Sequence, residues 1–287
     1  MQAADLPLYP RNESELRGRF EKGGFDPEEI PDGDQARLLL NLLELYARED
    51  KDLAPATRPL CECCPNHEPC WAGIEDARRT PGTDRREDGG IILPWVGARY
   101  KPGGLVVIAI NPNVAPDHRT FLLSEHEISW RHHCVLENDQ KSDEGSWFAY
   151  RMLRSAAALL DCGDKLPITD RDRPQDLVDA LHRTARLQAV KCVPRRHRSK
   201  PTSAMEQACA PFLLEDELGI LRPRVILALG NVPDQAISRL SGYQYLESAS
   251  SEFLWRHRLA ANWGSSEVFA IPHPAALGGR GNGATKT

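Results

Sequence analysis

Four short apolar segments of the chain each end in residues that could bind a ligand or position a reacting group. The segments span residues 105–110, 187–192, 225–230 and 268–273. The residues at their ends are Asn111-Pro112-Asn113, Lys191 to Arg196, Gly230-Asn231 and His273-Pro274. Amides, imidazoles and cations can orient water or stabilise negative charge. Asn-Pro and His-Pro pairs also form ordinary turns, but four such ends at matching positions favour a functional site.

Half of the cysteines lie close together in a second group of residues suited to chemistry. The segment CECCPNHEPC at 61–70 holds four of the eight cysteines. Cys61 and Cys64 have the spacing of a metal-binding turn, and Cys70 offers a further thiolate. In a reducing compartment such cysteines are thiols or metal ligands rather than disulfides.

A dense basic run follows the second apolar segment. Residues 191–203 contain no acidic side chain. Their basic residues are Lys191, Arg195, Arg196, His197, Arg198 and Lys200. Such a run can be a solvated surface, but its position beside the strand ends favours contact with phosphate. The net charge of the whole chain is -5, so positive charge that would attract a nucleic acid is concentrated in this loop.

Helical patterns between the apolar segments determine how the segments are arranged. Periodicity predicts helices over 146–160, 202–221 and 232–240. Apolar strands that alternate with helices are typical of a parallel sheet covered on both faces. We therefore predict an α/β fold, a three-layer α/β/α domain with a central, mainly parallel four-stranded sheet. Ligands bind such sheets at the carboxyl ends of the strands, where the polar segments meet.

The chain divides into an N-terminal extension over 1–90 and a main domain over 91–287. We predict an irregular segment over 1–33 and a helix over 34–49 with Asp34 as its N-cap. The extension, with this helix and the cysteine cluster, is expected to pack on the core of the main domain. The longest apolar run has six residues, whereas a membrane span needs about twenty. With no secretory signal at the N-terminus, we expect a cytoplasmic protein that does not enter membranes.

Several motifs resemble the uracil-DNA glycosylase superfamily, most closely its iron–sulfur-containing bacterial and archaeal families. They are INPN at 110–113, AVKCVPRRHRSKPTSAMEQAC at 189–209, LRPRVILALG at 221–230 and IPHPAAL at 271–277. The likeness covers most of residues 100–280. It implies that residues 91–287 form a catalytic domain that flips a base out of DNA and hydrolyses its N-glycosidic bond.

The resemblance also implies roles for individual residues. His273 matches the histidine that donates to O2 of the departing base, and Asn111 matches the residue that holds the attacking water. The base-binding residues would be Gln188, Phe121, Asn113 and Ile110. The DNA-binding residues would be Lys191, Arg195, Arg196, Arg198, Lys200, Arg280 and Leu277, of which Leu277 would be the wedge that fills the gap left by the flipped nucleotide.

Base recognition is where the sequence departs from the family pattern. The family commonly has Asn where this chain has Gln188. An amide can exchange its donor and acceptor by a flip, so Gln188 alone does not separate uracil from cytosine. The resemblance therefore implies that the substrate is uracil or a modified cytosine, such as glucosylated hydroxymethylcytosine of phage DNA. The chain would act in base-excision repair or in anti-phage defence, and the alternative is a non-catalytic DNA-binding or base-sensing module.

The same families bind an iron–sulfur cluster through four cysteines. Cys192 and Cys209 match two of them, and the N-terminal pair would come from Cys61, Cys63, Cys64 and Cys70, with Cys61, Cys64 and Cys70 as the first candidates. The cofactor implied is a [4Fe-4S] cluster, with structural zinc as the alternative. We expect a monomer that binds DNA and is associated with the bacterial nucleoid.

Overall fold

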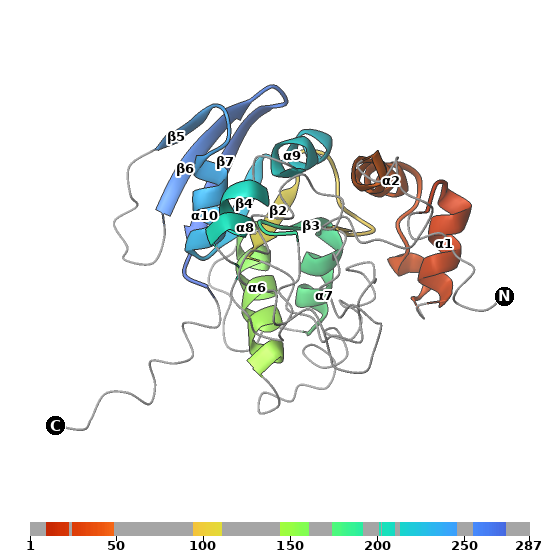
Figure 1. Cartoon of the computed structure of the whole chain (residues 1–287). Coiled ribbons are helices and arrows are strands. Elements are labelled where there is room, and N and C mark those ends of the chain that lie inside the picture. The colour runs from red at the N-terminus through yellow and green to blue at the C-terminus, as the bar shows by residue number, and fades with distance from the viewer. Residues whose placement is uncertain are drawn as a thin grey trace, which may run out of the picture.

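Uninterrupted apolar runs form the two central strands of a seven-stranded mixed sheet. The sheet order is β1-β3-β2-β4-β7-β6-β5 in the computed structural model, and β3, β2, β4 and β7 are mutually parallel (Figure 1). The strands are β1 Trp95–Val96, β2 Leu105–Ala109, β3 Thr184–Gln188, β4 Val225–Leu229, β5 Tyr243–Tyr245, β6 Trp255–Ala261 and β7 Gly264–Ile271. The structure describes residues 10–22, 25–48, 94–110, 144–160, 174–191, 201, 203–209, 213–245 and 255–273.

The α/β class and the parallel centre of four strands are confirmed, but the sheet is larger than four strands. Three antiparallel strands, β1, β5 and β6, extend it at its two sides. Part of β6 alternates between exposed Arg256 and Arg258 and buried His257 and Leu259, which is the pattern of a strand with one solvated face. Continuous apolar runs do not reveal a strand of this kind, so β6 was not predicted.

The strand predicted at 187–192 is instead β3, Thr184–Gln188, which begins three residues earlier. All five of its residues are buried, including Thr184, Arg186 and Gln188. Because these polar side chains alternate with apolar ones, hydrophobicity alone gave the wrong register for this strand.

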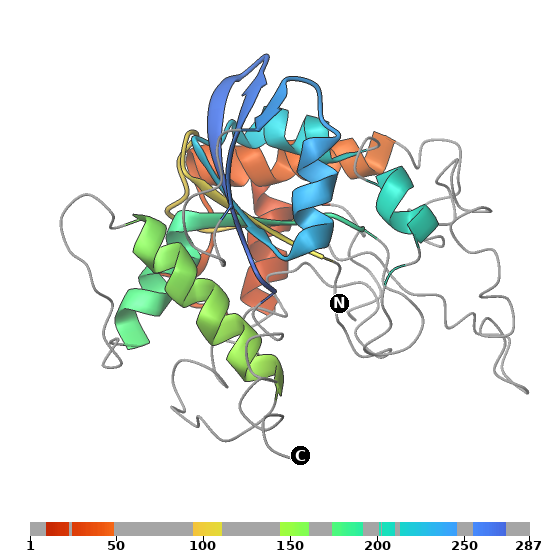
Figure 2. The same ribbon diagram turned by 90° about the vertical axis from the view of Figure 1, so that its left-hand side faces the viewer.

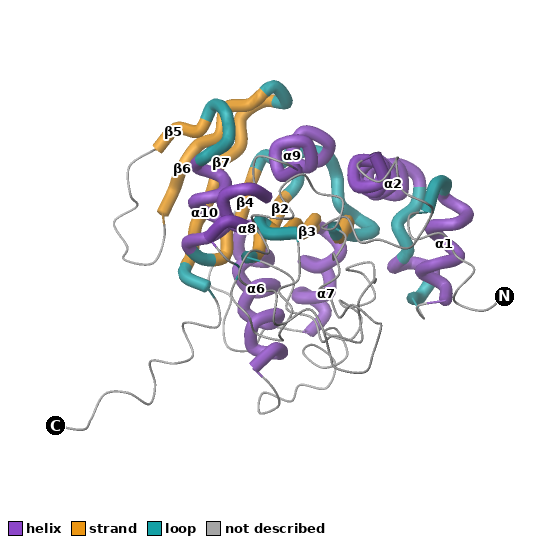
Figure 3. Tube along the Cα trace, in the orientation of Figure 1, coloured by secondary structure: helices purple, strands orange, loops and turns teal. Residues whose placement is uncertain are grey.

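Helices cover both sides of the sheet. They are α1 Glu13–Lys22, η2 Pro27–Glu29, α2 Gly33–Arg48, α6 Glu144–Leu160, α7 Pro174–Arg183, α8 Ser203–Cys209, α9 Glu215–Leu221 and α10 Asn231–Ser238. Helix α6 packs against α7, and these two contact β2 and β3, whereas α2 packs against α9, and α10 contacts β4. Figures 2 and 3 show the two groups on opposite sides of the sheet, which gives the three layers expected.

Several helix predictions need correction. The helix predicted over 202–221 is two helices, α8 and α9, and the segment predicted as irregular contains α1. Helix α7 was not expected. Helix α2 begins at Gly33, so Asp34 lies in its first turn and is not the N-cap. The carbonyl of Asp32 accepts from Gln35 N at 3.0 Å and Ala36 N at 3.2 Å, which places the cap two residues earlier, at Asp32.

The described N-terminal helices share their hydrophobic core with the sheet. Leu16 and Phe20 of α1 and Leu39 of α2 are buried in the same cluster as β2. Trp95 of β1 lies at this junction, with its ring centroid 6.4 Å from those of Phe20 and Phe25. The expected division at residue 90 stays a prediction, because residues 49–93 lie outside the described part.

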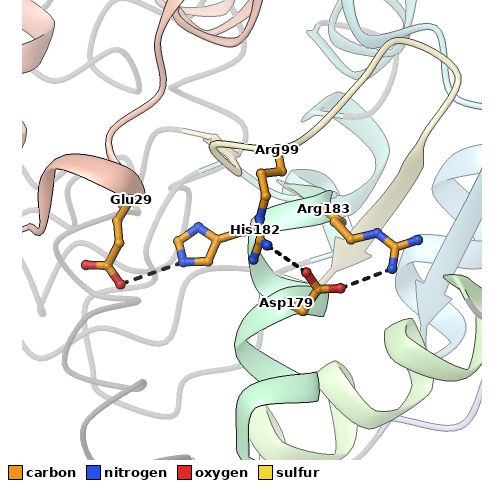
Figure 4. A network of polar contacts seen from close by, with 5 residues as sticks. All are labelled: Glu29, Arg99, Asp179, His182 and Arg183. Carbon is orange, nitrogen blue, oxygen red and sulfur yellow. Dashed lines mark hydrogen bonds and ion pairs between the residues drawn. The ribbon is translucent and has the colours of Figure 1, made fainter.

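Polar contacts reinforce this junction (Figure 4). His182 Nε2 of α7 lies 3.7 Å from Glu29 Oε1 of η2, and both side chains are buried. Asp179 lies between Arg99, at 2.9 Å, and Arg183, at 3.0 Å. The contact of Glu29 with His182 ties the N-terminal residues to the helix that leads directly into β3, and Arg99 joins the segment after β1 to the same helix.

Tyr100 connects the same region to α9. Its hydroxyl donates to the carbonyl of Leu221 at 3.0 Å, and its own carbonyl accepts from Gln35 Nε2 at 2.8 Å. Burial raises the pKa of Tyr100 well above its usual range, so this phenol stays protonated and remains a donor. Among the described helices, none is long and apolar enough to span a bilayer.

Candidate active site

The four parallel strands bring their carboxyl ends to one edge of the sheet. Backbone hydrogen bonds continue past the strands and fix the residues that follow. Ala189 N donates to Ala109 O, and Val190 N donates to Ile110 O, both at 2.8 Å. Gly230 N donates to Ile271 O at 2.8 Å. The residues after β3 and β4 are therefore held by the sheet itself, as expected for a site at this edge.

Gln188, the last residue of β3, places a buried amide at this edge. The residue is 3% exposed, and neither amide atom has a hydrogen-bond partner within the described part of the chain. Leaving a buried polar group unsatisfied costs about 1–3 kcal/mol. A ligand with a matching donor and acceptor would satisfy both atoms, so this amide is suited to recognition.

His273 lies two residues beyond the end of β7 and is half-buried. Burial lowers its pKa below the ordinary value of 6.5. The imidazole is therefore neutral at neutral pH, with one ring nitrogen as a donor and the other as an acceptor. A neutral donor of this kind can bind an oxygen that gains negative charge.

Gly230 packs against His273 from the neighbouring strand. Its φ of 97° lies in the region that favours glycine, and a Cβ built on it would be 3.1 Å from Cβ of His273. The absence of a side chain at Gly230 therefore allows His273 to lie close to the end of β4.

Gln188 and His273 occupy opposite sides of the same edge. Two strands, β2 and β4, separate β3 from β7 in the sheet order. Three strand spacings of about 4.8 Å put the two strand ends about 14 Å apart. A ligand over the ends of β2 and β4 would therefore lie between the amide and the imidazole.

Lys191 is buried, which corrects the expectation that it contacts DNA. Its Nζ donates to the carbonyl of Gln188 and to the Oε2 carboxylate atom of Glu217 in α9. The side chains of Lys191 and Glu217 are 3% and 0% exposed. An ammonium group enclosed in this way cannot reach a phosphate without breaking the pair.

Sequence analysis did not identify Glu217, although the sequence contains a signal for it. Glu217 shares a helical face with Leu214, Leu218 and Leu221, all of which are buried. An acidic residue in an apolar stripe of this spacing lies on the buried face, and a buried carboxylate needs a partner from outside the helix.

Cys209, the last residue of α8, is buried against Val190 and Met205. It is the only expected metal ligand within the described residues, and those residues contain no group of three or more His, Cys, Asp or Glu that could hold a metal. Ile110 accepts the hydrogen bond from Val190 and is half-buried. The base-binding role of Ile110 stays a prediction.

The other expected site residues lie outside the described part of the chain. They are Asn111, Asn113, Phe121, Arg195, Arg196, Arg198, Lys200, Leu277, Arg280, Cys61, Cys63, Cys64, Cys70 and Cys192. Their roles therefore stay predictions.

A family model agrees with this region of the chain. Residues 151–286 match the model described as the uracil DNA glycosylase superfamily. The match includes β3, β4 and β7, with Gln188 and His273, whereas β2 and Asn111 precede it. A comparison with curated proteins finds no match.

Proposed function

We propose that the chain is a monofunctional DNA glycosylase, because its residues 151–286 match the model of the uracil DNA glycosylase superfamily. It flips a non-standard pyrimidine out of DNA and hydrolyses the N-glycosidic bond, which leaves an abasic site. The observation that carries the proposal is the pair at one sheet edge, in which Gln188 is a buried amide without a partner among the described residues and His273 is an imidazole kept neutral by burial.

The reaction separates charge between the sugar and the base. The bond between C1′ and the base nitrogen breaks, and its electron pair leaves on the base, largely at O2. The sugar becomes cation-like, a water oxygen bonds to C1′, and the water proton is released. His273 donates its ring N–H to O2 and stabilises the developing charge. Asn111 orients the water, for which little basicity is required because the electrophile is almost a free cation.

Gln188 reads the edge of the flipped pyrimidine. The oxygen and nitrogen of its amide can pair with the N3 and C4 groups of uracil, or with those of a cytosine after a flip. Asn113, Ile110 and Phe121 would complete the pocket. Uracil and a modified cytosine, such as glucosylated hydroxymethylcytosine, are therefore the two substrates to test, corresponding to base-excision repair and anti-phage defence.

The environment of Lys191 supports the monofunctional mechanism. A glycosylase that also cleaves the strand attacks C1′ with an amine and forms a Schiff base. The amine of Lys191 is enclosed by Glu217 and the carbonyl of Gln188, so it is not available for that attack. Borohydride should therefore trap no covalent complex between the protein and DNA.

The loop after Lys191 would bind the DNA backbone. Arg195, Arg196, Arg198 and Lys200 provide four cations for phosphates, Leu277 provides the wedge, and Arg280 lies three residues beyond it. If phosphate contacts of this loop dominate affinity, binding should weaken steeply as the salt concentration rises.

A [4Fe-4S] cluster would join this loop to the N-terminal cysteines. Cys209 lies in the same buried cluster as Val190, which precedes Cys192 by two residues in the sequence. Cys192 and Cys209 would supply two thiolates, and Cys61, Cys64 and Cys70 are the candidates for the others. The cluster would be structural. Visible absorbance together with iron and sulfide in the purified protein would support the cluster. Stoichiometric zinc in their place would favour the structural zinc site.

The direct test offers the protein oligonucleotides with uracil, and phage DNA with hydroxymethylcytosine or its glucosylated form. Abasic sites are scored by alkaline cleavage. We expect His273→Ala, Asn111→Ala and Gln188→Ala to lose activity. Gln244→Ala, which removes an exposed amide from β5, should retain it. Binding of these DNAs without abasic sites would favour the alternative, a base-sensing module.

A further inference from the structure

Lys191 and Glu217 form a buried ion pair that also holds the backbone of Gln188. The pair joins the turn after β3 to α9, and one Lys191 ammonium group donates both to the Glu217 carboxylate and to the Gln188 carbonyl. The residue that offers an amide to the ligand is thus held through its own carbonyl oxygen.

Stability alone is a weak explanation for such a pair. Transfer of two charges out of water costs several kcal/mol per ion, and well-packed apolar residues often replace a buried pair without loss. The pair does, however, impose geometry, because an ammonium group that donates to two acceptors restricts the position of both. A role in positioning therefore accounts for the pair better than a role in stability.

The turn from Gln188 to Lys191 is restrained from two directions. Ala189 and Val190 donate to the backbone around the end of β2, and Lys191 reaches back to Gln188 and across to Glu217. Together these contacts fix the direction in which the chain leaves β3. The side chain of Gln188 begins at that point, so the same contacts also limit where its amide can lie.

We propose that Lys191 and Glu217 are positioning residues that set the orientation of the Gln188 amide and thereby the selectivity for the base. This inference rests on the proposed function, since it assigns base selectivity to the same site. Neither residue touches the base, and both act through the backbone of Gln188.

The first test uses Glu217→Gln, which keeps the size of the side chain and removes its charge. We expect the ratio of kcat/KM for uracil to kcat/KM for hydroxymethylcytosine in oligonucleotides to change at least about tenfold. A purely structural role would lower the amount of active protein and reduce both values equally. Asp216→Asn, an exposed change in the same helix, should leave the ratio as it is in the unchanged protein.

A second variant keeps the test decisive if Glu217→Gln fails to fold, because that change leaves Lys191 buried without its charged partner. The double change Lys191→Met with Glu217→Leu removes both charges and keeps apolar volume. We expect this protein to fold and to show the same altered ratio. An unaltered ratio in both variants would overturn the proposal.

A readout without substrate separates this proposal from the proposed function. Hydrogen exchange of the Ala189 and Val190 amides should be faster by at least about tenfold in both variants, whereas exchange within β2 stays slow. If the unchanged protein excises no base, the proposed function fails, and exchange still decides the positioning role. Faster exchange supports it, and exchange at the rate of the unchanged protein overturns it.

Discussion

Gly230 leaves His273 just enough room, since a Cβ built on Gly230 would lie 3.1 Å from Cβ of His273. Gly230 directly follows β4, and His273 follows β7, the next strand in the sheet. Gly230 N also donates to Ile271 O at 2.8 Å, so a backbone hydrogen bond joins the two strand ends. The position of the imidazole therefore depends on a residue that has no side chain.

Gly230→Ala should displace His273 while the fold is retained. With a φ of 97° and a ψ of 177°, Gly230 lies in a backbone region that costs an alanine about 1–3 kcal/mol, and the new methyl group would press on the His273 side chain. We expect a free energy of unfolding lower by about that amount and a fall in kcat of at least about tenfold, from a loss of about 1.4 kcal/mol in the transition state. Urea denaturation and the abasic-site assay measure the two effects.

Gly18→Ala is the matched control for that substitution. Gly18 lies within α1, and a Cβ there meets nothing within 4 Å. Alanine should stabilise the helix by up to about 1 kcal/mol and leave kcat as it was. Full activity of Gly230→Ala would contradict the close dependence of His273 on Gly230.

The pKa of His273 should be below 6.5, because burial disfavours the charged imidazole. The unfolded chain takes up this proton near pH 6.5, whereas the native chain takes it up only at lower pH. The unfolded state thus binds more protons as the pH falls, and the native state loses stability in that range. Above about pH 6.5 the residue contributes no pH dependence, since it is neutral in both states.

NMR titration of the ring protons gives the His273 pKa directly. His273→Gln should remove the part of the acid-side loss of stability that belongs to this residue, as measured by urea denaturation above and below pH 6.5. A midpoint above 6.5 would rule out burial as the dominant influence.

Tyr100→Phe should destabilise the protein by about 1–3 kcal/mol. The change removes the donor to Leu221 O at 3.0 Å and leaves that buried carbonyl without this bond. Thermal or urea unfolding measures the loss. Tyr245→Phe is the control, because Tyr245 is 61% exposed on β5 and its change should cost less than about 0.5 kcal/mol. Equal costs for the two variants would contradict the role of the buried bond.

Gly242→Ala should destabilise the β5–β6 pairing by about 2 kcal/mol or more. Gly242 has a φ of 78°, and a Cβ on it would lie 1.7 Å from the carbonyl oxygen of Ala260. Gly264→Ala is the comparison, since Gly264 also has a positive φ but open space around it. The difference between their unfolding free energies isolates the clash, and a smaller cost at Gly242 would contradict it.

The sequence predicts the central strands well because their residues are all apolar and almost all buried. All five residues of β2 are buried, as are the last four of β4, so no polar side chain interrupts the signal. The sequence predicts His273 at the carboxyl edge because parallel strands share a direction, whereas it predicts Gln188 near the start of a strand that Gln188 in fact ends. In β3 the signal fails, since Arg186 and Gln188 are buried as polar residues.

What the sequence could not predict depends on partners distant along the chain. Glu217 is 26 residues from Lys191, and the local sequence around each residue does not indicate that the other is its partner. The burial of Lys191 follows only once α9 packs beside the turn after β3. Its basic neighbours in the sequence made it resemble a phosphate contact, whereas its position requires an internal partner.

The two outermost strands of the sheet are its shortest. Strand β1 has two residues and β5 has three. A sheet border offers unpaired N–H and C=O groups to any other chain that approaches, and a border this short offers few of them. A second copy therefore finds few backbone groups with which to form hydrogen bonds. We expect the chain to resist edge-to-edge aggregation even when it is concentrated on DNA.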